Sequence, residues 1–453
     1  MDLRRKIVCK FGGSSVENAT QIEKVKNIIQ DSKNRKYVVV SAPGRDEKHR
    51  QKITDHLVNI ATEGAHLHKL VEVKESKIAI LDKFKGLIKD LHVKSDGLLE
   101  SLEKDLETKL EGDKRTAFLA SRGEHYNAKI IAAYLEKSGI ATQLCLPESI
   151  GFQVSGDILG AKVDLVSHAN LQTLKESESV CVMPGFYGVT QEGDIAVLSR
   201  GGSDLTGGEL AYAVGASLYE NWSDIDGVYE VDPRIVPNSD VIPRLTFKEI
   251  RLLSSKGFNV FHFDAMNNCR RGNIPINIRN TNRPSSDGTL ILNERVPEED
   301  VVGIAKLDNM AYIYIEKEGL GETIGFTETL LNIFNQYGIN TYHYPTDKDD
   351  IAVLLKKEDL AGNINNLRSA IEDKLSPDSL EVVYDISILS MVGIGMKYNS
   401  SVIADAVWAL KENHIDIEML DHGPAKISFH IGVSQQHANK ALELLYEILV
   451  LKR

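Results

Sequence analysis

Residues 7–16 read Ile-Val-Cys-Lys-Phe-Gly-Gly-Ser-Ser-Val, and this stretch decides how the chain begins to fold. An apolar run ends at Lys10, the glycines Gly12 and Gly13 follow, and a segment of helical character comes next. Glycines let backbone N–H groups approach phosphate oxygens, a helix N-terminus favours an anion, and the lysine adds a full charge. The stretch predicts a strand, a turn and a helix that hold a phosphate. Because the lysine precedes the glycines, the stretch is not a Walker loop. The alternative is an ordinary tight turn that binds no ligand.

Further short runs rich in Val and Ile alternate with longer helical patterns through roughly the first three hundred residues. The expected strands are residues 7–9, 37–40, 142–145, 179–183 and 195–198. This alternation predicts an α/β fold with a largely parallel sheet between helices. Ligands in such folds bind beyond the carboxyl ends of the strands, where the motifs described below are also found.

Length, composition and charge restrict the classes of protein that remain. A chain of 453 residues is expected to form two or three domains. Its 42% hydrophobic and 26% charged residues are typical of globular proteins. The net charge of −12 argues against nucleic acid or an anionic membrane as the main partner. No apolar run reaches the roughly 18 residues that a membrane span needs.

The cysteines and the N-terminus indicate where the protein is found. Four cysteines lie far apart and show no metal-binding spacing: Cys9, Cys145, Cys181 and Cys269. They are expected to be buried thiols in a reducing compartment. Residues 1–6 are charged and lead directly into a strand, without an apolar signal segment. We therefore expect a cytoplasmic protein.

Two regions depart from the strand–helix alternation. Residues of about 64–112 have apolar side chains at helical spacing and no strand, which predicts a helical insertion beside the sheet. Those apolar residues are Ile78, Leu81, Phe84, Leu87, Ile88 and Leu91. After residues 295–300 an internal repeat begins, in which 332–340 align with 408–416 and 351–355 with 427–431.

Each copy of the repeat has the pattern of a ferredoxin-like βαββαβ unit, with turns at Gly338 and His414. The pair resembles tandem ACT domains, which in other enzymes bind regulatory amino acids at subunit interfaces. The alternative is that the repeats serve only for dimerisation.

Five motifs in order resemble those of the aspartokinases, monofunctional members of the amino acid kinase family with C-terminal tandem ACT domains. They are residues 10–16, 38–42, 121–124, 199–204 and 222–234. A fused homoserine dehydrogenase is not expected, because the repeat occupies the rest of the chain. The resemblance implies a kinase domain at 1–297 and a regulatory region at 301–453. The repeats would span about 310–385 and 386–453, with strand 301–308 as a candidate addition to the second.

The resemblance implies roles for individual residues in the aspartate site. Arg200 would hold the α-carboxylate of the substrate with its planar guanidinium, and Glu124 would receive the α-ammonium. Further lining residues would be Ser41, Thr54, Phe186, Gly201 and Ser203. Asp204 would join Lys10, Gly12 and Gly13 as a catalytic group. The segment 44–52 before Thr54 is longer than in some members of the family, which makes the place of Thr54 an open question.

The resemblance also implies a nucleotide site. Lys10, Gly12, Gly13 and Ser14 would bind phosphate, together with Ser223 and Asp224 near the ribose and phosphates. Tyr229 would contact the nucleoside and Arg234 the phosphate oxygens. Asn259 stands where many members carry a second phosphate-binding lysine, and an amide supplies no charge. Lys256 and Arg234 are the candidates for compensation. ATP would bring Mg²⁺, with no direct ligation by protein side chains.

The implied activity is phosphorylation of the β-carboxylate of L-aspartate to 4-phospho-L-aspartate, the entry step to lysine, threonine and methionine. The carboxylate has a pKa of about 3.9 and needs no general base. Two alternatives remain open: another amino-acid kinase of this fold, or a catalytically weakened regulator that senses amino acids. Lysine, threonine or both would be effectors, with Gly325, Asn340 and Asp347 as candidate contacts. The repeats would form a homodimer, and dimers could pair into tetramers.

Overall fold

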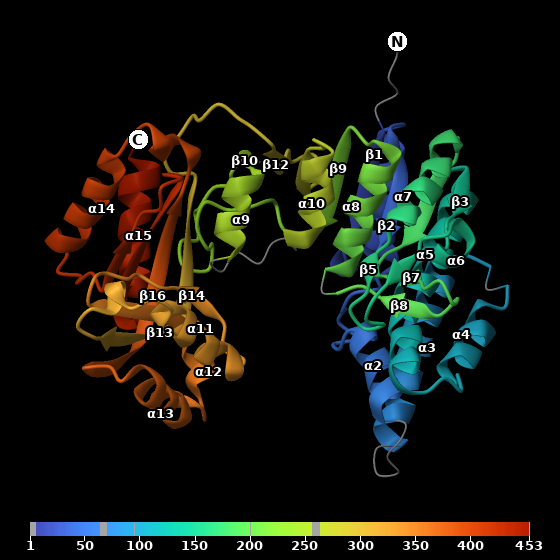
Figure 1. Ribbon diagram of the computed structural model, residues 1–453. Coiled ribbons are helices and arrows are strands. Elements are labelled where there is room, and N and C mark those ends of the chain that lie inside the picture. The colour runs from blue at the N-terminus through green and yellow to red at the C-terminus, as the bar shows by residue number, and fades with distance from the viewer. Residues whose placement is uncertain (1–5, 64–69, 95, 200, 256–262, 453) are drawn as a thin grey trace. The chain divides into compact units, whose positions relative to one another are not determined.

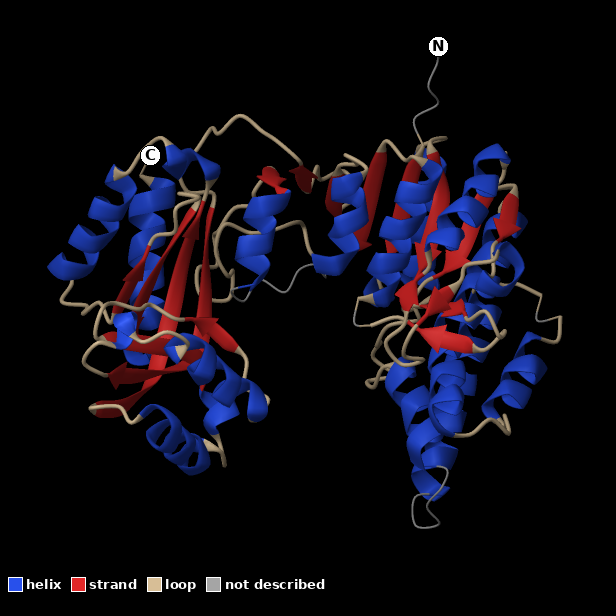
Figure 2. Ribbon diagram, viewed as in Figure 1, coloured by secondary structure: helices blue, strands red, loops and turns tan. Residues whose placement is uncertain are grey.

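A computed structural model describes residues 6–63, 70–94, 96–199, 201–255 and 263–452 (Figures 1 and 2). By its internal contacts the chain divides into two units. The first comprises Met1–Val228, Val241–Lys248 and Asn259–Arg295. The second comprises Tyr229–Asp240, Glu249–Phe258 and Val296–Arg453. Two segments that the sequence assigned to the kinase domain therefore belong to the second unit.

The first unit contains an eight-stranded sheet in the order β10-β12-β11-β9-β1-β2-β6-β3. Its strands are β1 Ile7–Phe11, β2 Arg35–Val40, β3 Thr142–Leu144, β6 Val180–Pro184, β9 Leu218–Ser223, β10 Arg244–Thr246, β11 Ile276–Asn280 and β12 Thr289–Leu292. All neighbours are parallel except β11 and β12. Nearly every residue of β1, β2 and β6 is buried, as expected for strands covered on both faces. The prediction of a largely parallel sheet is confirmed.

Nine helices of the first unit accompany this sheet in the described residues, and a 3₁₀ turn, η1 Gly13–Val16, follows β1. The helices are α1 Ala19–Asp31, α2 Ile53–Glu63, α3 Leu70–Asp90, α4 Leu98–Leu106, α5 Gly112–Lys137, α6 Pro147–Ile150, α7 Leu165–Gln172, α8 Gly202–Val214 and α10 Phe263–Arg271, whereas α9 Phe247–Ser255 lies mostly in the second unit. Helix α5 contacts β2, β3 and β6, and α8 contacts β1, β2 and β9. The ends of β1, β2 and β9 and the start of α8 thereby meet in one region.

The region expected to be a helical insertion contains α3 and α4. Phe84, Leu87, Ile88 and Leu91 are buried in the same core as β1 and β2. Ile78, which shares their spacing, is 57% exposed, so the apolar face of α3 is narrower than the sequence pattern indicated.

The expected strand at residues 195–198 does not join the main sheet. β8 Ile195–Val197 pairs with β7 Tyr187–Val189 in a separate antiparallel hairpin. A second small pair consists of β4 Val154–Ser155 and β5 Lys162–Val163. The apolar pattern identified the strand correctly but carried no information about its partner, because hairpin and sheet strands share the same period of two.

The second unit contains a six-stranded antiparallel sheet in the order β14-β15-β13-β16-β18-β17. Its strands are β13 Gly303–Glu316, β14 Thr341–His343, β15 Asp350–Lys356, β16 Ser379–Val392, β17 Met419–Asp421 and β18 Ser428–Ser434. Its helices are α11 Phe326–Gln336, α12 Lys357–Leu360, α13 Ile364–Leu375, α14 Ser401–Glu412, α15 Ala438–Tyr446 and the π-helix Glu447–Leu451.

Each half of this sheet is a ferredoxin-like unit that shares the long strands β13 and β16. Residues 310–316 of β13 pair with β15 and with residues 379–386 of β16. Residues 303–307 pair with 388–392, which in turn pair with β18. The start of β13 therefore supplies the fourth strand of the second half. The expected turns at Gly338 and His414 both have positive φ, at 66° and 54°, and each follows a helix.

The segment Tyr229–Asp240 is attached to the second half by specific contacts. The carbonyl of Glu230 accepts a 2.7 Å hydrogen bond from the N–H of Ile304, and the Tyr446 hydroxyl donates to Glu230 Oε2 at 2.8 Å. Val231 is fully buried in the core of this half. These contacts explain why the segment belongs to the second unit.

A buried carboxylate, Glu220, lies on β9 in the middle of the first unit's sheet and is 2% exposed. Arg35 binds it through Nε at 2.8 Å and Nη2 at 3.1 Å, and the Trp222 indole donates to it at 3.0 Å. Cys9 and Arg279 make longer contacts. Burial raises the pKa of Glu220, but hydrogen bonds and charge from Arg35 outweigh it and lower the pKa. The ionised form is therefore part of the fold.

Among the described residues, no helix is long and apolar enough to cross a membrane. Cys9, Cys145, Cys181 and Cys269 are all buried free thiols.

The contacts of Arg35 predict a difference in stability between two variants. Replacing Glu220→Gln removes the buried partner and should lower the free energy of unfolding by about 3 kcal/mol, because Arg35 is left uncompensated. Replacing Asp31→Asn removes a partner that is 83% exposed and should cost less than about 1 kcal/mol. Urea unfolding followed by Trp222 fluorescence, in a Trp408→Phe background, measures both. Equal losses would contradict a structural role for the buried pair.

Candidate active site

The phosphate cradle expected after β1 is held by three neighbouring backbone segments. The Gly12 N–H donates to the carbonyl of Trp222 at 3.0 Å, and the Gly44 N–H donates to the carbonyl of Gly13 at 2.9 Å. A Cβ at Gly44 would lie 2.6 Å from the Gly13 oxygen, so this position requires glycine. The ends of β1, β2 and β9 are thereby locked together around Gly13.

The helix expected directly after the glycines is displaced. The turn η1 has four residues, and α1 starts at Ala19 with the side chain of Asn18 accepting from the Gln21 N–H at 3.0 Å. The dipole of α1 therefore ends at its own cap and not at Gly12 and Gly13. The Gly12 N–H expected to bind phosphate instead donates to Trp222, so any phosphate here would depend on the N–H of Gly13 and on Lys10.

Lys10 lies on the central strand and is only 8% exposed. Its Nζ is 2.5 Å from Asp204 Oδ1, in the first turn of α8. Asn221, on β9, donates to the same oxygen at 2.9 Å. An almost buried ammonium needs such a partner, and this pairing fixes its position at the carboxyl end of the sheet.

Glu124, on α5, is 5% exposed, and its Oε2 is buried without a hydrogen-bond partner among the described residues. Burial raises the pKa of Glu124 to about 8, although backbone hydrogen bonds and the charge of Lys10 act in the opposite direction. The neighbouring Ser41 is held by Asn127, which donates to its carbonyl at 2.7 Å. An unpartnered carboxylate of this kind is suited to receive a cationic group.

Phe186 adopts a positive φ of 76°, which is unusual for a bulky residue. Its N–H donates to Thr206 Oγ1 at 3.1 Å, and Thr206 donates to the carbonyl of Gly202 at 2.8 Å. A Cβ at Gly202 would lie 2.7 Å from the Phe186 ring. The loop after β6 and the N-terminus of α8 are therefore packed closely, with Gly201 at φ 76° where the helix begins.

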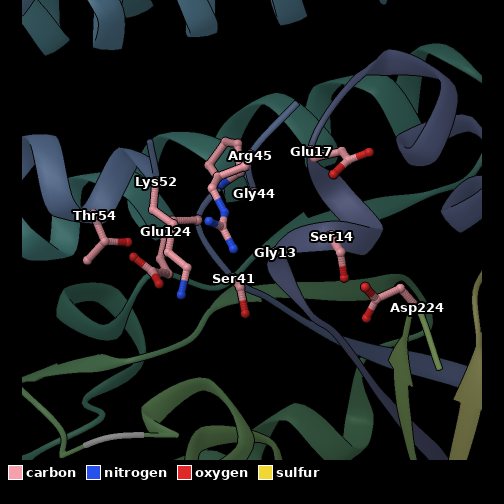
Figure 3. A pocket seen from close by; sticks show the side chains of 12 residues that line it. Gly13, Ser14, Glu17, Ser41, Gly44, Arg45, Lys52, Thr54, Glu124 and Asp224 are labelled. Carbon is pink, nitrogen blue, oxygen red and sulfur yellow. The ribbon is translucent and has the colours of Figure 1, made fainter. Parts of the chain in front are cut away.

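Two cavities adjoin these residues, and Figure 3 shows the side chains that line the larger one. The smaller, about 350 Å³, is lined by Lys10, Ser41, Lys52, Thr54, Asp55, Glu124, Phe186, Gly201, Gly202, Ser203 and Asp204. The larger, about 460 Å³, is lined by Gly13, Ser14, Glu17, Ser41, Ala42, Pro43, Gly44, Arg45, Lys52, Thr54, Glu124 and Asp224. Four residues line both: Ser41, Lys52, Thr54 and Glu124.

Most of the residues expected in the aspartate site therefore lie around one space. Thr54 lines both cavities in spite of the long segment that precedes it. Asp224 and Ser14 line the larger cavity. Gly12 is buried behind the cradle, and Ser223 accepts a 3.4 Å hydrogen bond from the Ile225 N–H without lining either cavity.

Other expected residues are not placed in this region. Arg200 and Asn259 lie outside the described residues, as does Lys256. Tyr229 and Arg234 belong to the second unit, whereas both cavities are lined by residues of the first. The Arg234 side chain is 86% exposed and is paired with Asp232, with Nη2 2.6 Å from Oδ2.

The candidate effector residues lie in the first half of the second unit. Gly325 precedes α11 with φ 83°, while Asn340 and Asp347 are exposed in the loops before β14 and β15. A cavity of about 430 Å³ in the second unit is lined by other residues, among them Tyr312, Tyr314 and Glu381 of the first half and Glu418 of the second.

Sequence reasoning missed four charged residues that line the cavities: Glu17, Arg45, Lys52 and Asp55. The only signal was the unusual length and basic character of the segment before Thr54. Within the described chain, no group of three or more His, Cys, Asp or Glu side chains is arranged to hold a metal ion.

Comparison with known proteins identifies the family of this chain. The amino acid kinase family model matches residues 5–280, and an ACT domain model matches residues 389–449. Aspartokinase 3 of Bacillus subtilis (strain 168) is 35% identical over 447 residues, which cover 97% of this chain and 98% of that protein.

Two crystal structures are also similar. The aspartate kinase of Clostridium acetobutylicum, described as an allosteric enzyme, has a TM-score of 0.85 and 31% identity, covering 98% of this chain and 100% of that one. Aspartokinase III of E. coli, in complex with aspartate and ADP, has a TM-score of 0.73 and 22% identity over 98% of this chain and 99% of that one, and so shares the fold. The chain therefore belongs to the amino acid kinase family and, within it, to the aspartokinases.

Proposed function

We propose that this aspartate kinase transfers the γ-phosphoryl group of ATP to the β-carboxylate of L-aspartate in the space shared by the two cavities. The observation that carries this assignment is that two opposite charges line one cavity. Glu124 has a buried carboxylate oxygen without a hydrogen-bond partner among the described residues, and Lys10 supplies an ammonium. Glu124 suits the α-ammonium of an amino acid, and Lys10 suits a phosphoryl group.

The chemistry requires placement and charge neutralisation more than proton transfer. The β-carboxylate of aspartate is ionised at neutral pH and attacks phosphorus directly, as the ADP oxygen leaves. Lys10 and the backbone N–H of Gly13 would neutralise charge on the transferred group, and Asp204 keeps Lys10 in place. Arg200 remains our proposal for the α-carboxylate, with Ser41, Thr54, Phe186, Gly201 and Ser203 around the substrate.

We assign the larger cavity to the nucleotide phosphates. Ser14 and Asp224 line this cavity, and Ser223 directly precedes Asp224 in the sequence. Only the resemblance supports nucleotide contacts by Tyr229, Arg234 and Asn259. Mg²⁺ would neutralise part of the phosphate charge, and the acidic side chains Glu17 and Asp224 of this cavity fit a cation carried by the nucleotide.

We further propose regulation by lysine, threonine or both, through Gly325, Asn340 and Asp347. The tandem ferredoxin-like halves and the allosteric character of the similar Clostridium enzyme support this. We also propose a homodimer formed through the repeats, in which dimers could pair into tetramers. The boundary between the kinase domain and the regulatory region is proposed at 297–301. The four free thiols support a cytoplasmic location.

Lys10→Ala should lower kcat by at least about 1000-fold, because the principal cation at the transferred group is lost. Lys6→Ala is the matched control, since Lys6 lies just before the same strand and binds the carbonyl of Lys175. Steady-state ADP release reports activity, and circular dichroism reports folding. A near-normal kcat in Lys10→Ala would remove Lys10 from the reaction.

The raised pKa of Glu124 predicts that aspartate binding depends on pH. Below pH 8 the free enzyme holds this group mainly protonated, and the α-ammonium requires the carboxylate. The KM for aspartate should therefore fall about 25-fold from pH 6.5 to 8.5, while the KM for ATP stays nearly constant. Glu124→Gln should raise the KM and abolish its pH dependence. A wild-type KM that is flat or rises over this range would refute the role of Glu124.

An inhibition panel tests the regulatory proposal. Millimolar lysine, threonine or the two together should lower the initial rate of ADP release, because an effector that prefers the less active state shifts the population toward it. Alanine at the same concentration serves as the control. If the rate is unchanged by lysine, by threonine and by both, neither acts as a feedback inhibitor.

A further inference from the structure

Acidic side chains outnumber basic ones around the two cavities of the described active-site region. Five acidic side chains line the two cavities: Glu17, Asp55, Glu124, Asp204 and Asp224. The described cations that line them are Lys10, Arg45 and Lys52. Lys10 is already paired with Asp204, and ATP and aspartate add further negative charge. A further cation beside Lys10 would neutralise part of this negative charge at the transferred group.

Lys52 has the position that this role requires. It lines both cavities, together with Ser41, Thr54 and Glu124, whereas Arg45 lines only the larger one. Figure 3 shows the side chains of Lys52 and Arg45 beside Glu124 and Ser41. Within the described chain, the Lys52 side chain has neither an ion pair nor a hydrogen bond, so its ammonium is available to a ligand.

The segment that carries Lys52 is fixed in place. The buried Lys83 of α3 donates to the carbonyl of Gly44 at 3.0 Å and to Asp46 Oδ2 at 2.5 Å. Asp46 Oδ1 also accepts from the N–H of His49 at 2.7 Å, and His49 Nε2 lies 3.2 Å from Asp82 of α3.

The two ends of the segment are also held. The N–H of Gly44 donates to the carbonyl of Gly13 at one end. At the other end Lys52 directly precedes α2, and its carbonyl accepts from the N–H groups of Asp55 and His56. The segment is thus attached to the glycine cradle, to α3 and to α2, and Lys52 is presented from a constrained backbone.

We propose that Lys52 contacts the transferred phosphoryl group from the side opposite Lys10 and neutralises its charge as it passes from ADP to the aspartate β-carboxylate. This inference rests on the proposed function and adds to it a second cation at the transferred group. ADP lacks the γ-phosphoryl group, so Lys52 contributes to turnover and not to the binding of ADP.

The test compares Lys52→Met with Arg50→Met, which removes a positive charge from the same segment at an exposed residue that lines neither cavity. Lys52→Met should lower kcat about 100-fold and leave the Kd for ADP within about two-fold of wild type. Arg50→Met should leave both nearly unchanged. Coupled ADP release gives kcat, and calorimetry gives the Kd.

Three results would overturn the proposal: a kcat of Lys52→Met within about three-fold of wild type, an equal loss of kcat in Arg50→Met, or a fall in ADP affinity that matches the fall in kcat. Each of these places Lys52 outside the contact described. Absence of aspartate-dependent turnover in the wild-type protein would instead refute the proposed function itself, so the two failures are distinguishable.

Discussion

The structure depends on one electrostatic constraint: an ammonium must be held nearly buried at the end of the central strand, where two anionic reactants are to meet. Lys10 satisfies it through Asp204, which Asn221 holds in turn. The three residues come from β1, α8 and β9, so the site forms only when these elements are assembled. Burying a lysine without a partner would shift it toward its neutral form and remove the charge that the reaction needs.

The backbone around Lys10 is constrained equally strongly. Gly13 and Gly44 approach so closely that a methyl group at Gly44 would collide with the carbonyl of Gly13, and Gly202 touches the ring of Phe186. These contacts fix the ends of neighbouring strands to each other. Glu124 lines the same cavity as Lys10, and its Oε2 is buried without a hydrogen-bond partner among the described residues, which leaves this oxygen available to a cationic group.

Much of this could be predicted from sequence, because local patterns report local structure. The apolar run before Lys10 identified the central strand, and the repeat after residue 300 identified two ferredoxin-like halves. A sequence pattern does not identify the strand with which another strand pairs, so residues 195–198 were assigned to the main sheet and not to the hairpin. The pattern also placed the start of the first helix, and with it the helix dipole, too close to Gly13. The strand β9 was missed because Glu220 and Asn221 interrupt its apolar character. Lys52 was missed because its role depends on the fold of a long segment.

The most direct test of the central claim is a crystal structure with ADP and L-aspartate bound. Our account predicts the β-phosphate within hydrogen-bond distance of Lys10 Nζ and of the backbone N–H at Gly13, and the aspartate ammonium on Glu124. A nucleotide bound away from Lys10, or an aspartate whose ammonium does not contact Glu124, would contradict it.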